Sequence, residues 1–150
     1  MAQGYLKTPW GWLMVTSKKS LITSIIFKEL CPLFSSLNFE IKDCLIQIQQ
    51  YLKKERKSFK INYNLNKTKF QQEVLEVVAN IAYGKTMTYE EIAQKINHPK
   101  AMRAVGTTLK NNPLAIVIPC HRVVNKNKIK NNYFYGLEIK LGLWEIEKII

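Results

Sequence analysis

Residues 88–111 form the sequence TYEEIAQKINHPKAMRAVGTTLKN, and this stretch decides the fold of the second half of the chain. Thr88 and Glu91 have the spacing of a capping box, in which each side chain bonds the backbone N–H of the other residue. We therefore predict that a helix begins here. Its apolar face contains Tyr89, Ile92, Ala93 and Ile96. The sequence Asn-His-Pro at residues 97–99 then breaks the chain.

A second helix is predicted for residues 100–111, and the two helices with their tight turn form a helix-turn-helix. The core face of this helix contains Met102, Val105 and Leu109. The opposite face carries Arg103, Thr107 and Lys110. Gly106 lies between them, where it lets a backbone approach. This face suits a phosphate backbone, and the alternative is the solvated face of an ordinary helical hairpin.

Another helix is predicted upstream from a stripe of apolar residues at helical spacing. The stripe contains Phe70, Val74, Val77 and Ile81. Gly84 follows where a left-handed helix cap is expected. The second half of the chain is therefore predicted to be mainly helical.

The first part of the chain predicts a small α+β unit. Residues 10–16 and 21–27 are rich in β-branched and aromatic side chains and flank the polar residues 17–20, which indicates a hairpin. A helix is predicted for residues 38–54. Its apolar stripe contains Ile41, Leu45, Ile48 and Leu52. The polar residues around 53–66 indicate a boundary, so we predict domains at 1–62 and 63–150.

The charge of the chain favours a polyanionic partner. The 150 residues include 23 Lys and Arg against 11 Asp and Glu, a formal net charge of +12. An excess of this size steers nucleic acid toward a protein, although a merely soluble surface is the alternative.

No apolar run reaches the roughly 20 residues of a membrane span, and no signal peptide is evident. We expect a cytoplasmic protein, or a nuclear one in a eukaryotic cell.

A candidate nucleophile follows the helix-turn-helix. The apolar residues 114–118 lead into Pro119-Cys120-His121-Arg122-Val123-Val124. A thiol reacts as its thiolate and needs a base or a positive charge nearby, which His121 and Arg122 supply. Neighbouring residues of an extended chain point to opposite faces, so we expect His121 to reach Cys120 through a water. Glu147, on an otherwise apolar segment, is the candidate that orients the base; a buried structural thiol is the alternative.

The hexapeptide closely resembles the active-site signature of the O6-alkylguanine-DNA alkyltransferases, also called methylated-DNA-protein-cysteine methyltransferases. The resemblance covers roughly residues 69–147. Its further matches are Phe70 to Leu75, Thr88-Tyr89, Ile92-Ala93, Arg103 to Gly106 and Asn112-Pro113. It implies an α+β fold, with a small amino-terminal antiparallel sheet and helix of ribonuclease H-like type, then a mainly helical domain. The first third of the chain is similar only in length and in its order of strands before helix.

The resemblance also implies a reaction. Cys120 would take the alkyl group from O6-alkylguanine, and from O4-alkylthymine, and become an irreversible thioether, so one molecule would repair one lesion. His121 would activate the thiol through water and Glu147 would hold His121. Asn112 would brace the turn. Tyr89 would donate a hydrogen bond to the leaving guanine.

The implied partner is double-stranded DNA, approached through its minor groove with the alkylated nucleotide flipped out. Arg103 would fill the space that the nucleotide leaves. The other DNA contacts implied are Tyr89, Thr107, Lys110 and Arg122. The implied substrate pocket contains Leu109, Val123, Tyr133 and Phe134. We expect no membrane, no obligate protein partner and a monomer.

The chain departs from the family at one loop and at one metal site. Phe134 and Tyr135 stand where the family has small residues, which leaves the accepted alkyl size open. The backbone amide of Phe134 can still donate to the O6 oxygen. Some members hold a structural zinc in the amino-terminal domain, but Cys31 and Cys44 without a histidine before His98 cannot assemble that site. We therefore expect no metal and no cofactor.

Two other functions remain open at this point. A protein that recognises alkylated bases without repairing them would bind the same DNA, although such relatives lack the acceptor cysteine. A cysteine hydrolase using Cys120, His121 and Glu147 would require an oxyanion hole and would turn over. Product formed in excess of the protein would indicate the hydrolase.

Overall fold

The computed structural model describes residues 1–30, 35–126 and 133–149. The chain forms two units. The first contains Met1–Leu65 and Pro113–Ala115, and the second contains Asn66–Asn112 and Ile116–Ile150. The division between residues 62 and 63 stays a prediction about domains, and the return of residues 113–115 to the first unit was not anticipated from the sequence.

Three antiparallel strands build the sheet of the first unit. They are β1 (Ala2–Thr8), β2 (Gly11–Lys18) and β3 (Leu21–Lys28), in the order β1-β2-β3. The predicted hairpin is confirmed as β2 and β3. Its turn residues Lys19 and Ser20 both have positive φ, 52° and 66°, as the tight turns of twisted hairpins require. Strand β1 was not predicted.

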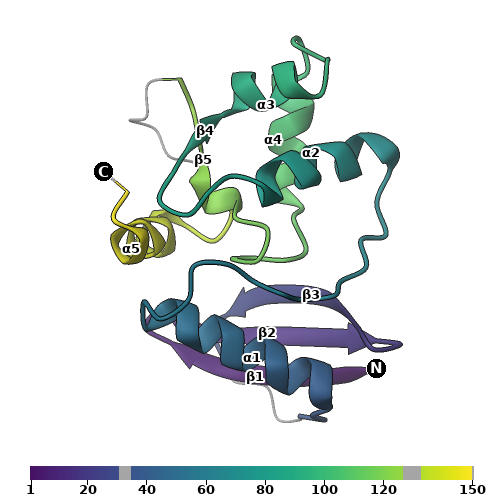
Figure 1. Cartoon of the computed structure of the whole chain (residues 1–150), viewed down its shortest axis with the longest axis vertical. Helices are drawn as coiled ribbons and strands as arrows, with labels where there is room; N and C mark the ends of the chain where they lie inside the picture. Colours follow the sequence, from purple (N-terminus) through teal and green to yellow (C-terminus); the bar gives the residue numbers. More distant parts are fainter. Residues whose placement is uncertain (31–34, 127–132, 150) are drawn as a thin grey trace. The chain divides into compact units, whose positions relative to one another are not determined.

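Helix α1 (Phe39–Leu52) covers one face of this sheet (Figure 1). Its N-cap is Asn38, whose side chain accepts a hydrogen bond from the Ile41 backbone. Of the predicted stripe, Ile41 and Ile48 are buried, while Leu45, which packs near Gly4 of β1, and Leu52 are half-buried. The other buried residues of α1 are Cys44, Gln47 and Tyr51.

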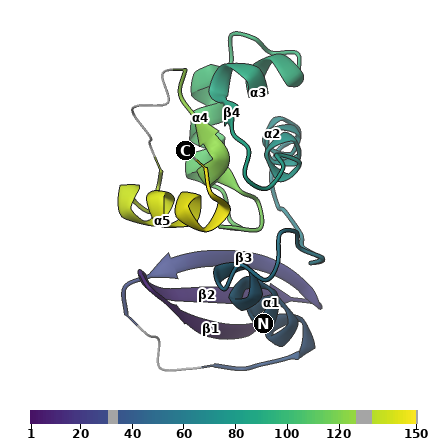
Figure 2. The same cartoon turned by 60° about the vertical axis from the view of Figure 1, so that its left-hand side comes forward.

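The second unit contains three helices that pack on one another (Figure 2). They are α2 (Lys69–Ala79), α3 (Tyr89–Lys95) and α4 (Met102–Lys110). The capping box predicted at Thr88 is confirmed, with Glu91 as its second member. The buried side chains between the helices are Val74, Leu75, Val78, Ile92, Ala93, Val105 and Leu109.

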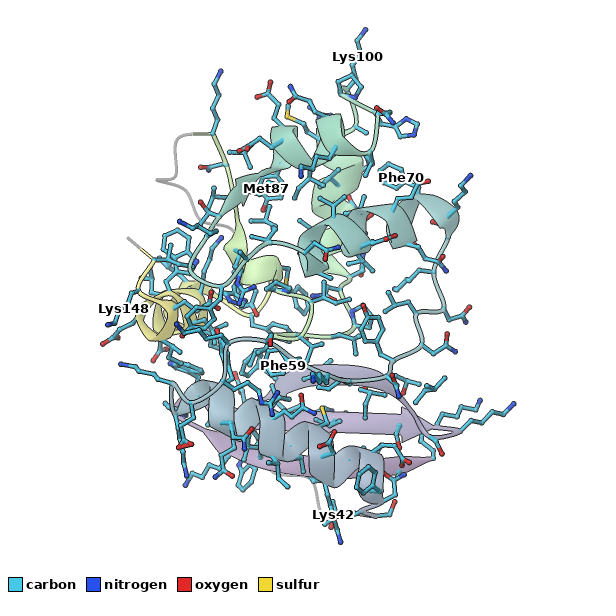
Figure 3. The ribbon with its side chains drawn as sticks, in the orientation of Figure 1. Lys42, Phe59, Phe70, Met87, Lys100 and Lys148 are labelled. Carbon is cyan, nitrogen blue, oxygen red and sulfur yellow. The ribbon has the colours of Figure 1, made fainter. Side chains whose placement is uncertain are left out.

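In the predicted stripe of the first of these helices, Val74 is buried and Val77 is half-buried. Phe70, labelled in Figure 3, is half-buried and packs edge-on against His98 with ring centroids 5.9 Å apart. Met102, predicted in the core, is the first residue of α4 and is 46% exposed. Gly84 does have a positive φ of 78°, but α2 already ends at Ala79, so Gly84 is not its cap.

The carboxy-terminal part of the second unit carries a short helical turn and the last helix. The segment η1 (Cys120–Arg122) is a 3-10 turn rather than the extended chain that we predicted. Strand β5 (Val123–Val124) follows and pairs in parallel with β4 (Met87–Thr88). Helix α5 (Leu137–Glu147) packs against η1 (Figure 1). The predicted α+β class is confirmed.

None of the described helices is long and apolar enough to cross a membrane.

Candidate active site

A cavity of about 1060 Å³ opens in the second unit, and Cys120 lies on its wall. Helices α3 and α4 supply one side of it. The lining residues are Tyr89, Glu90, Met102, Arg103, Gly106, Thr107, Leu109, Lys110, Cys120, Asn125, Lys126, Tyr133, Phe134 and Leu137. The thiol and the helix-turn-helix therefore face the same space.

Asn112 fixes the turn that carries the thiol. Its side-chain amide donates to the Ile118 carbonyl oxygen at 2.9 Å and to Cys120 Sγ at 3.2 Å. The Cys120 backbone N–H donates to the same Ile118 carbonyl oxygen at 2.8 Å. Burial raises the pKa of the Cys120 thiol, while the Asn112 hydrogen bond and the charge of Lys140 act against that rise. Thiolate formation therefore depends on these neighbours.

A buried histidine and carboxylate lie behind the thiol. His121 Nε2 and Glu147 Oε2 are 2.6 Å apart, and both side chains are inaccessible to solvent. The indole N–H of Trp144 donates to the His121 carbonyl oxygen at 2.7 Å, which ties η1 to α5. Burial lowers the pKa of His121, although Glu147 opposes this. A neutral imidazole, which can accept a proton, is therefore favoured.

The other oxygen of Glu147 has two further donors. Arg122 Nε donates to Glu147 Oε1 at 2.8 Å, and the Gly84 backbone N–H donates to it at 3.0 Å. Burial works to raise the pKa of Glu147, but the hydrogen bonds and charge of His121, with the Arg122 and Gly84 hydrogen bonds, lower it to about 2. Glu147 is therefore ionised at neutral pH and holds His121 in place.

The structure contradicts two of the predicted roles. Arg122 is buried, and its Nη1 donates to the Ile81 carbonyl oxygen at 2.7 Å in addition to the Glu147 bond, so it has no surface for a DNA phosphate. Val123 is buried in β5 and does not line the cavity. Both roles were carried over from the family resemblance, which does not show that Arg122 in the 3-10 turn and Val123 in β5 are buried.

Lys140 is a second buried cation in this region. Its Nζ donates to the Val123 carbonyl oxygen at 2.9 Å and lies 5.7 Å from the centre of the Trp144 ring. Burial lowers the pKa of Lys140 to about 8, and the interaction with Cys120 opposes this. The sequence analysis missed Lys140. Its position beside Ile139 and one turn before Leu143 and Trp144, on an apolar helix, was the available signal.

The face of α4 predicted to meet a polyanion lies on the cavity. Arg103, Thr107 and Lys110 are exposed and line it. Gly106 lies between them, and a Cβ there would be 3.9 Å from the Tyr89 ring. Burial and the nearby Cys120 raise the pKa of Tyr89, so its hydroxyl keeps its proton. The cavity thus combines a thiol, a phenol and surface cations.

Most of the predicted site residues are brought together by the fold. Those on the cavity wall are Tyr89, Arg103, Thr107, Leu109, Lys110, Cys120, Tyr133 and Phe134. Those buried behind the thiol are Asn112, His121 and Glu147. Met102 and Leu137 also line the cavity and were not predicted there. Within the described part of the chain, no three His, Cys, Asp or Glu side chains gather as metal ligands would.

The other described cysteine differs from Cys120. Cys44 is completely buried in α1. Burial, with a contribution from Asp43, raises the pKa of Cys44 to about 12. Cys44 is therefore an inert thiol at neutral pH. Cys31 lies outside the described residues.

Comparison with known proteins shows which family this chain resembles. The family described as "6-O-methylguanine DNA methyltransferase, DNA binding domain" matches residues 69–149. The inducible methylated-DNA–protein-cysteine methyltransferase of Bacillus subtilis is 42% identical over 103 residues, which are 69% of this chain and 58% of that protein. The match therefore spans less than two thirds of that relative.

Two other relatives match over nearly the whole chain. The Haemophilus influenzae methylated-DNA–protein-cysteine methyltransferase is 33% identical, over 97% of this chain and 85% of that protein. The crystal structure of Mycobacterium tuberculosis O6-methylguanine methyltransferase has a TM-score of 0.88 and 31% identity, over 98% of this chain and 92% of that one. A structure of the M. tuberculosis protein in complex with DNA has a TM-score of 0.87 at 32% identity, over 96% of this chain and 91% of that one. The chain belongs to the methylated-DNA–protein-cysteine methyltransferase family.

Proposed function

We propose that this protein repairs DNA by moving the alkyl group of O6-alkylguanine, and of O4-alkylthymine, onto its own Cys120. The observation that carries the proposal is the position of Cys120 on a cavity wall shared with α4, with the His121–Glu147 pair buried behind it. A thiol in this setting can act as a nucleophile toward a base presented by bound DNA.

The transfer is a single displacement. A bond forms between Cys120 Sγ and the alkyl carbon, while the bond between that carbon and O6 breaks. The thiol proton passes to His121 through a water, and Glu147 stabilises the resulting imidazolium. Tyr89 donates a hydrogen bond to the guanine ring as the bond to O6 breaks. The proton that His121 took from the thiol is finally passed to the guanine, so the base leaves in neutral form. The product thioether does not hydrolyse, so each molecule acts once.

Binding to DNA is assigned to residues 63–150. The relative from M. tuberculosis was solved in complex with DNA, and the matched family is named for a DNA-binding domain. We infer that α4 enters the minor groove, that Thr107 and Lys110 contact phosphates, and that Arg103 replaces the flipped nucleotide. The formal charge of +12 supports this affinity for a polyanion.

The test is the mass of the intact protein and of its peptides after incubation with a duplex that carries one O6-methylguanine. We expect one methyl group per molecule, on the Cys120 peptide, and no further turnover. Cys44→Ser is the matched control and should keep the transfer, while Cys120→Ser should lose it. An unmodified protein that binds the duplex tightly would indicate a lesion-recognition protein. Product in excess of protein would indicate a hydrolase.

The role of Arg103 is tested separately. Arg103→Ala should slow the transfer from duplex DNA far more than the transfer from a free O6-alkylguanine base, because only the duplex requires a nucleotide to be extruded. Equal losses on the two substrates would contradict the insertion of Arg103.

A further inference from the structure

The cavity of the second unit carries a single acidic side chain among several basic ones. Of the described residues that line it, Arg103, Lys110 and Lys126 are basic and only Glu90 is acidic. Glu90 forms no ion pair and no side-chain hydrogen bond with another described residue. A carboxylate on a surface that meets DNA weakens binding by repulsion unless the DNA supplies a hydrogen-bond donor to it. The proposed transfer to Cys120 gives Glu90 no role.

Glu90 lies at the rim of the cavity. It is exposed, as is Arg103 on the adjacent helix α4, whereas Cys120 is only 9% exposed. Glu91, the next residue of α3, forms the capping box with Thr88, so the cap of this helix is complete without Glu90. In the proposed complex the flipped base reaches Cys120 while Arg103 stays in the base stack. Side chains at the rim therefore meet the base pairs beside the lesion.

The minor groove offers one kind of donor to a carboxylate at this rim. An A·T pair presents only acceptor atoms there, adenine N3 and thymine O2, whereas a G·C pair adds the 2-amino group of guanine. A carboxylate accepts hydrogen bonds and donates none. Guanine is therefore the base whose minor-groove edge can bond Glu90 and offset the repulsion.

We propose that Glu90 accepts a hydrogen bond from the 2-amino group of a guanine in a base pair adjacent to the lesion. The protein then repairs lesions next to G·C pairs faster than lesions next to A·T pairs. The inference rests on the proposed function, in which DNA binds through its minor groove. Glu90 is thus a specificity-determining residue for the sequence around the lesion, whereas the residues around Cys120 act on the alkylated base itself.

The experiment compares two duplexes that differ only in this amino group. Both carry O6-methylguanine between two G·C pairs, and in the second duplex inosine replaces the two flanking guanines, which removes their 2-amino groups. The rate constant of methyl transfer is measured at low concentrations of protein and DNA, where it includes the binding step. We expect the guanine-to-inosine rate ratio to fall about fivefold to tenfold from the wild-type protein to Glu90→Ala, as for the loss of one hydrogen bond.

Glu76→Ala is the matched control, because Glu76 is an exposed glutamate of α2 that lies outside the cavity lining. It removes the same charge and should leave the ratio unchanged. Both rates of a ratio come from one preparation, so a misfolded fraction cancels, and the effect of inosine on base flipping cancels when two proteins are compared.

An equal ratio in Glu90→Ala and in the wild-type protein would overturn the inference. If Glu90→Ala then took the methyl group faster from both duplexes, Glu90 would act by repulsion alone. Failure of the wild-type protein to take the methyl group from either duplex would overturn the proposed function itself.

Discussion

At the scale of single residues, one carboxylate organises the buried part of the site. Glu147 accepts hydrogen bonds from Arg122 and Gly84 on one oxygen and pairs with His121 on the other. The positive charge of Arg122 near His121 works to lower the pKa of His121. Burial is the main cause that lowers the pKa of His121, and Arg122, a positioning residue through its bond to Glu147, adds to that lowering.

Removing the charge of Arg122 should shift the pH dependence of the transfer. In Arg122→Met the pKa of His121 rises, because the cation that disfavours the imidazolium is absent. Only the neutral imidazole accepts a proton, so the acidic limb of the rate profile moves to higher pH. We expect a larger loss of rate near pH 6 than near pH 8, measured by single-turnover methyl transfer. Arg122→Lys should restore much of the transfer rate at acidic pH, because it keeps the positive charge. An equal loss of rate at every pH in Arg122→Met would mean that Arg122 only supports the fold.

Lys140 should assist the thiolate only while it is protonated. Its pKa of about 8 means that it is charged below that pH and neutral above it. Lys140→Met should therefore slow the reaction of Cys120 with iodoacetamide by about threefold to tenfold below pH 8, and the two proteins should converge above it. A constant ratio across the pH range would contradict electrostatic support by Lys140.

At the scale of elements, the loop before β4 meets the end of α5 through Gly84. Its φ of 78° is unfavourable for other residues, and a Cβ there would lie 3.3 Å from the Glu147 carbonyl oxygen. The Tyr83 hydroxyl donates to the Ile146 carbonyl oxygen at 3.1 Å and strengthens the same junction. This junction sets the position of the Glu147 carboxylate.

Gly84→Ala should both destabilise the protein and slow the transfer. We expect a loss of about 1 kcal/mol or more in the free energy of unfolding, and a slower reaction because the hydrogen bond to Glu147 is displaced. Gly136→Ala is the matched control. Gly136 also has a positive φ, 101°, but, apart from its chain neighbours, no atom of the described residues lies within 4 Å of its added Cβ. It should lose stability without a comparable change in the rate per folded molecule, as measured by denaturation and single-turnover assays.

The elements that the sequence predicts best are those with local signals. The capping box at Thr88 and the hairpin of β2 and β3 are set by neighbouring residues, and both were predicted. Strand β1 was missed because Gly4 weakens its pattern. The glycine is needed because a Cβ there would overlap the Ile41 side chain of α1. Such a requirement arises only in the folded unit.

The burial of two polar side chains was also missed, because their hydrogen-bond partners are distant in the sequence. Gln47 is buried because its side chain bonds both the N–H and the carbonyl oxygen of Lys60, so the predicted apolar stripe has a polar member. Arg122 is buried because Glu147 and Ile81 supply its acceptors from two distant segments. The site residues were predicted from the family resemblance. Which of them are buried was known only from the structure.

At the scale of the whole molecule, the pKa of Glu147 links the site to stability. The carboxyl has a pKa of about 2 in the folded protein against a reference value of 4.5. A lowered pKa contributes stability that is present above the unfolded value and is lost as the pH falls toward the folded value. We expect wild-type protein to lose about 3 kcal/mol between pH 4.5 and 2 from this group. Denaturation of Glu147→Gln across this range should show a flatter dependence on pH.

The course of the backbone also limits how the protein can be divided. The Ile25 N–H donates to the Pro113 carbonyl oxygen, and the Ala115 N–H donates to the Ile25 carbonyl oxygen, so residues 113–115 complete the first unit from within the second half of the chain. Asn112, which holds Cys120, comes directly before them. A protease cut between Leu65 and Asn66 would therefore leave two fragments that still share a hydrogen-bonded bridge. Deleting residues 1–65 would remove the Ile25 hydrogen bonds that hold residues 113–115, so we expect the segment leading to Cys120 to lose this support.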